Sequence, residues 1–262
     1  MISLALLLAL AVSPSPASPH PAGARQDPPQ ILDERPEVKA FLDELGAHIK
    51  ARGEKDPEAI GVLDKLVQEF PNCGPKDRAT IVKALVDCFD VKRTKELEEG
   101  IPDDRLVQAA ATALGVMGPE SAKPLSALIG DKAHRKNQRL QQRLALSLGK
   151  TKSLEGQKTL LALLKHKDAP MQATGAEALA NYFEAELDTR KMLFEELLKT
   201  LMDQKGRKDN VTDLEAQERW NTISGPILET LQKLSGHGET DPDLWLRWWN
   251  DNKKKDWGAK AG

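Results

Sequence analysis

A ten-residue helical pattern that occurs three times between residues 106 and 180 constrains the fold of this chain more than any other feature. The three copies start at Leu106, Leu140 and Met171, at offsets of 34 and 31 residues. Each copy starts with a large apolar residue and has Ala five positions on, Leu eight positions on and Gly or Ala directly after that Leu. Small residues let neighbouring helices approach closely, so the pattern predicts stacked helical hairpins.

The rest of the chain from residue 36 onward also has helical periodicity, with apolar residues at spacings of three and four. Each copy of the pattern is followed by a leucine-rich second helix, and Pro and Gly recur between the helices. We therefore predict about five helical hairpins over residues 57–238. A capping helix over residues 36–56 precedes them. The predicted fold class is all-α, a right-handed α-α superhelix of the α-solenoid type.

Composition supports a helical fold and gives no general reason to expect a polyanion partner. Aromatic residues make up 4% of the 262 residues, and residues that favour sheets are sparse, which argues against a large β fold. The formal net charge is -2, from 38 basic and 40 acidic residues.

The N-terminus is typical of an exported protein. A nine-residue apolar run, 4–12, is too short to span a membrane and is followed by small residues before Arg25. We expect a signal peptide over residues 1–24, a Pro-rich linker over 25–35, and no transmembrane segment in the mature chain. The predicted location is periplasmic or secreted. Because no Lys or Arg precedes the run, a misassigned start codon or an uncleaved anchor stays open.

Export would permit a disulfide between Cys73 and Cys88, but the helix expected over residues 76–89 separates them. An α-helix rises about 1.5 Å per residue, so this helix separates the two cysteines by roughly 15 Å or more. A disulfide needs Cα atoms within roughly 7 Å of each other. The sequence predicts two unpaired thiols, with Cys88 on the packed face.

The segment from Lys132 to Lys152 contains seven basic residues and no acidic residue. Arg135, Arg139 and Arg143 are spaced by four, so they share one face if the helix begins early enough. Basic residues of this kind usually form a solvent-exposed face without a partner. The alternative is a binding site for an acidic protein, a cell-surface polymer or a lipid headgroup. No stacking aromatics lie among them, so we expect no nucleic-acid partner. The candidate binding residues are Arg135, Lys136, Arg139 and Arg143.

Four of the five tryptophans lie in the last 18 residues. Asp241 and Pro242 predict the start of a helix that places Trp245 and Trp249 on one face. We expect these two residues to form a structural cap within a C-terminal segment, residues 239–262. Trp248 is expected to be exposed and is the candidate for stacking on a sugar or a partner peptide.

Catalytic and metal-binding signals are absent from the sequence. The five histidines have no metal-ligand spacing, and neither His-Glu-x-x-His nor Cys-x-x-Cys occurs. Gly149-Lys150-Thr151 resembles the end of a phosphate-binding loop, but Leu144 stands where the loop needs a glycine. We therefore expect no catalytic residues, no metal and no cofactor.

Two segments resemble a known family. The segment from Val107 to Pro119, with its Ala-Leu-Gly ending, resembles the HEAT-like repeats of the PBS-lyase type. The Asp-Pro-x-x-Trp-x-x-Trp-Trp segment that starts at Asp241 is similar to the closing segment of many exported bacterial HEAT-repeat proteins.

This resemblance implies an α-solenoid used as an interaction surface, in general without an established reaction. The expected role is a non-catalytic scaffold in the cell envelope or secreted space that binds an unidentified protein partner on a face formed by the second helices. Two alternatives stay open: a bilin-lyase-like enzyme, and an envelope protein that binds polysaccharide through its C-terminal tryptophans.

Overall fold

A computed structural model describes residues 33–91, 96–98, 101–210 and 212–257, which belong to the unit Ile31–Gly262. The expected signal peptide, and the linker except for residues 33–35, lie outside the described residues.

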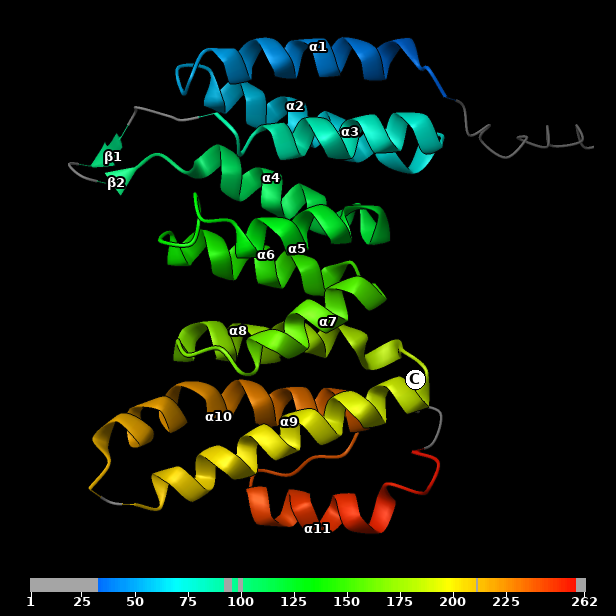
Figure 1. Cartoon of the computed structure of the whole chain (residues 1–262). Coiled ribbons are helices and arrows are strands. Elements are labelled where there is room, and N and C mark those ends of the chain that lie inside the picture. Colours follow the sequence, from blue (N-terminus) through cyan, green and yellow to red (C-terminus); the bar gives the residue numbers. More distant parts are fainter. Residues whose placement is uncertain (1–32, 92–95, 99–100, 211, 258–262) are drawn as a thin grey trace, which may run out of the picture. The chain divides into compact units, whose positions relative to one another are not determined.

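The described residues are helical apart from short connections and one small hairpin, which confirms the all-α class (Figure 1). The hairpin pairs β1 (Glu96–Glu98) with β2 (Ile101–Pro102) in antiparallel orientation. Three short 3₁₀ helices are η1 (Phe70–Asn72), η2 (Gly118–Ser121) and η3 (Ala180–Glu184). The α-helices are α1 (Pro36–Lys50), α2 (Asp56–Glu69), α3 (Pro75–Asp87), α4 (Arg105–Val116), α5 (Ala122–Gly130), α6 (Gln138–Lys150), α7 (Leu154–Leu163), α8 (Ala169–Leu179), α9 (Leu187–Lys208), α10 (Leu214–Ser235) and α11 (Pro242–Asn252).

Within this unit the helices form two layers (Figure 1). The even-numbered helices α2, α4, α6, α8 and α10 pack against one another in chain order. Odd-numbered helices pack onto the even helix that follows them, and α11 packs on α9. The core lies between the layers, where most leucines of the predicted second helices are buried. No described helix is both long and apolar enough to span a membrane.

The glycine that closes the repeated pattern explains the close packing of the even helices. A Cβ atom added to Gly115 in α4 would lie 2.9 Å from Cα and Cβ of Ser147 in α6. A Cβ atom added to Gly149 in α6 would lie 3.0 Å from Cα of Ala178 in α8 and closer still to the Ala178 carbonyl oxygen. Both contacts join the tenth residue of one copy to the eighth residue of the next copy. The copies of the pattern therefore make the same packing contact.

Cys73 and Cys88 are both buried and are not joined by a disulfide, which confirms the prediction that the two do not pair with each other. The Cys73 thiol donates to the Glu69 carbonyl oxygen at 3.2 Å, and the Cys88 thiol donates to the Ala84 carbonyl oxygen at 3.6 Å. Burial raises the pKa of the Cys73 thiol, which keeps it protonated and unreactive at neutral pH.

Candidate functional site

The structure does not place the predicted basic residues on a single helix face. Asn137 is the N-cap of α6 and its side chain accepts from the Leu140 amide at 3.0 Å, so α6 begins at Gln138. Arg135 therefore lies in the preceding loop and does not share the helix face of Arg139 and Arg143. The predicted alignment of three arginines is wrong at Arg135, because the cap starts the helix three residues too late.

Arg135 and Lys136 instead line a cavity of about 870 Å³, which we call the α5–α7 cavity. Its walls come from α5, α6, α7, the loop before α6 and the turn before α8. Inside it, the Thr159 hydroxyl of α7 donates to the Ser126 hydroxyl of α5 at 3.0 Å. Apolar and polar groups both line it, and the further residues are Ile129, Gly130, Gln138, Gln141, Ala162, Leu163, His166, Lys167, Asp168 and Met171.

A second cavity, of about 450 Å³, lies on the other side of the turn between α7 and α8, and we call it the α7–α9 cavity. The two cavities share His166 and Lys167 as lining residues. The Arg219 guanidinium of α10 holds this turn, since it donates to Gln172 Oε1 at 2.9 Å and to the carbonyl oxygen of Lys167. This cavity could not be predicted from the sequence because its walls come from the turn after α7 and from several separate helices, α8 to α10.

Arg143 lies away from both of these cavities, on the surface of the even-numbered helices. It lines a cavity of about 550 Å³ together with Lys150 of α6, Glu177 of α8 and Lys233 of α10. Arg139 is exposed and does not line any of the cavities described. The basic stretch therefore divides into a loop part, Arg135 and Lys136, and a helical part.

The tryptophans of the C-terminal segment surround Phe194 of α9. Trp245 and Trp249 are buried, with ring centroids 5.5 Å and 5.1 Å from that of Phe194. Asp241 accepts from the Asp243 amide at 2.8 Å and Pro242 is the first helical residue, which confirms the predicted start of α11. Arg190 and Lys191 of α9 lie over the ring of Trp257.

Trp248 is not exposed as expected, but partly buried. The His237 ring stacks on it with a centroid distance of 5.0 Å and an interplanar angle of 7°. Trp245 meets it edge-on at 5.7 Å, and Phe194 and Trp257 tilt against it. These rings already occupy the surroundings of the indole, which is unfavourable for a sugar platform.

A further cavity, of about 750 Å³, lies along α3 and was not predicted. Its lining is mostly apolar and includes Ala79, Val82 and Val86, and the Arg78–Glu120 ion pair of 3.1 Å lies at its side. In the sequence these residues have the spacing of an ordinary core face, which hides the cavity.

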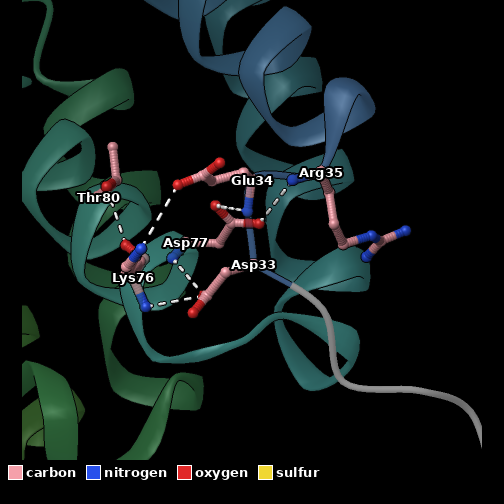
Figure 2. Close-up of polar contacts among 6 residues, drawn as sticks. All are labelled: Asp33, Glu34, Arg35, Lys76, Asp77 and Thr80. Carbon is pink, nitrogen blue, oxygen red and sulfur yellow. Dashed lines mark hydrogen bonds and ion pairs between the residues drawn. The ribbon is translucent and has the colours of Figure 1, made fainter.

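Residues 33–35, expected as the end of the linker, join α1 to α3 through two aspartates (Figure 2). The Asp33 carboxylate accepts from the amides of Lys76 and Asp77 at 2.9 and 3.2 Å, so it serves as the N-cap of α3, where Gly74 has no side chain. The Asp77 carboxylate in turn accepts from the amides of Glu34 and Arg35 at 3.0 and 3.1 Å. We call this pair the Asp33–Asp77 clasp.

Replacing Asp77 with Ala is expected to lower the free energy of unfolding by about 2 kcal/mol, because two backbone amides lose a charged acceptor. Glu34 has a φ of 62°, and the clasp holds this unfavourable conformation. Asp87→Ala is the matched control on α3, since among the described residues Asp87 pairs only with exposed Lys83, and it should cost less than about 0.5 kcal/mol. Urea unfolding of both variants tests this, and equal losses would contradict the clasp.

Among the described residues, no three His, Cys, Asp or Glu side chains gather in a way that could hold a metal ion. Comparisons of the chain with models of protein families, with curated proteins and with solved structures found no match.

Proposed function

We propose that this chain is a non-catalytic scaffold of HEAT-like helical hairpins, exported to the cell envelope or secreted space, that binds a protein partner. The repeated contact of Gly115 with Ser147 and of Gly149 with Ala178 supports the repeat architecture. A stack of equivalent hairpins presents a continuous series of helix ends and grooves, which suits such folds to binding extended partners.

The observation that carries the binding role is the α5–α7 cavity. It is large enough for several side chains of a partner, and it combines apolar walls with hydrogen-bonding groups and with Arg135 and Lys136, which form no ion pair among the described residues. Concave surfaces that combine apolar and polar groups are more typical of binding sites than of surfaces that contact only solvent. The tryptophans, in contrast, pack on one another and on Phe194, which supports a capping role for Trp245 and Trp249.

Affinity capture tests the scaffold role. The chain from residue 25 onward is immobilised, and a cell-envelope extract of the source organism is passed over it. We expect at least one protein to be retained in proportion to the immobilised chain and to be displaced by an excess of the free chain. If the column retains no more protein than a column of an unrelated helical protein, the result contradicts the proposal.

N-terminal mass determination of the exported form tests removal of the signal peptide. We expect a new N-terminus near Arg25.

A further inference from the structure

We infer that an acidic segment of a protein partner binds in extended form along one edge of the helices. This basic edge consists of residues 132–136, residues 165–167 and Arg207. The inference rests on the proposed function and adds to it the chemistry of the partner and the place where it binds. The α5–α7 and α7–α9 cavities lie side by side on this edge, because His166 and Lys167 line both.

The cations of the basic edge form no ion pairs with other described residues. Arg135, Lys136, Lys165, Lys167 and Arg207 are exposed, and none of them forms an ion pair within the part of the chain that the structure describes. Unpaired cations around a concave surface create a positive potential that attracts anionic groups.

Cations are scarce at the opposite ends of the hairpins. The connections that follow the even-numbered helices contain one Lys or Arg, namely Lys152, and it pairs with Glu184 at 2.6 Å. These connections are residues 70–74, 117–121, 151–153, 180–186 and 236–241. The concentration of unpaired cations at one edge is therefore not a general property of the turns.

Basic residues outnumber acidic residues in both cavities. Asp168 is the one carboxylate that lines the α5–α7 cavity, and the Gln138 amide donates to it at 3.3 Å. Glu196, Asp203 and Glu215 line the α7–α9 cavity together with Lys165, Lys167, Lys199, Arg207 and Arg219. Like charges repel, so we expect the acidic side chains of the partner to lie beside the cations of the basic edge and away from these carboxylates.

A peptide fits these groups better than a lipid headgroup or a sulfated sugar. Leu163 and Met171 line the α5–α7 cavity together with the cations Arg135 and Lys136. An apolar side chain of a peptide can contact these two residues, whereas a sulfated sugar or a lipid headgroup offers no apolar group of this kind. We therefore expect an apolar side chain next to the carboxylates of the partner.

Fluorescence anisotropy with synthetic peptides tests this inference. The probe is a labelled peptide of about ten residues, long enough to reach across both cavities, that contains Glu, Asp and Leu. We expect it to bind the full chain with an affinity that falls as salt is added. Two comparison peptides, one with Gln and Asn in place of the acids and one with Ser in place of Leu, should each bind several-fold more weakly.

Substitutions at the edge locate the site. Lys136→Glu combined with Lys167→Glu is expected to weaken binding of the probe by roughly tenfold, since both cations become anions. Arg139→Glu is the matched control, because Arg139 is exposed, comes from the same basic stretch and lines neither cavity, and it should leave binding within about twofold of the unchanged chain.

Several results would overturn the inference. One is equal binding of the acidic peptide and of the peptide with Gln and Asn in place of the acids. Another is an equal loss of affinity for the probe in the double variant and in Arg139→Glu. Tighter binding of phosphatidylglycerol vesicles or heparin than of the probe, lost in the double variant, would assign the edge to another class of ligand. If the affinity column retains an envelope protein equally with the unchanged chain and with the double variant, the scaffold function holds and the basic edge is not its binding site.

Discussion

Gly149→Ala is expected to lower the free energy of unfolding by about 2 to 3 kcal/mol, although Ala favours helix more than Gly does by about 1 kcal/mol. The added methyl group would lie 3.0 Å from Cα and carbonyl carbon of Ala178, and closer to the carbonyl oxygen. These are backbone atoms, so no side chain can turn away to make room. Relief requires that α6 and α8 move apart, which loosens the packing of the leucines beneath them.

Gly61→Ala is the control of opposite sign. Gly61 lies within α2, it is exposed, and a Cβ atom added there would meet no atom within 4 Å. The free energy of unfolding should therefore rise by up to about 1 kcal/mol through helix propensity alone. Urea unfolding followed by circular dichroism gives both values. A stabilised Gly149→Ala variant would mean that the repeats do not pack through this position.

The sequence predicted that small residues of the pattern let neighbouring helices approach closely, but it did not predict which residues Gly149 would contact. A glycine at the same place in two copies of a pattern indicates a position where no side chain fits, and the period indicates which helix comes next. The start of α11 was predictable for a similar reason, since Asp241 and Pro242 act on their own helix. Features of this kind depend on a few neighbouring residues and a spacing.

The Asp33–Asp77 clasp and the two cavities could not be predicted in the same way. Asp33 and Asp77 are 44 residues apart, and neither has a sequence neighbour that distinguishes it from other surface carboxylates. Arg135 looked helical from its spacing, but Asn137 begins the helix after it. The expected exposure of Trp248 failed because His237, in the connection before α11, folds back over its ring. Each of these outcomes depends on how separate segments meet.

Trp245→Ala is expected to lower the free energy of unfolding of the C-terminal region by about 3 to 5 kcal/mol. The side chain is 0% exposed, lies edge-on to Phe194, and donates from Nε1 to the Glu239 carbonyl oxygen at 3.1 Å. Its loss removes a large apolar contact and leaves a cavity beside Phe194. Leu246→Ala on the same helix should change the free energy of unfolding by less than about 0.5 kcal/mol, since Leu246 is 38% exposed.

As urea is added to Trp245→Ala, α11 should unfold before the other helices, because it packs mainly on α9 and lies at the end of the described unit. Tryptophan fluorescence reports on this end almost alone, as four of the five tryptophans lie in the last 18 residues, whereas circular dichroism reports on all helices. In the unchanged protein the two signals should unfold together. In Trp245→Ala the fluorescence transition should come at lower urea than the dichroism transition. Coincident transitions with a loss below about 1 kcal/mol would contradict the cap, because they would mean that α9 is stable without the tryptophans packed around Phe194.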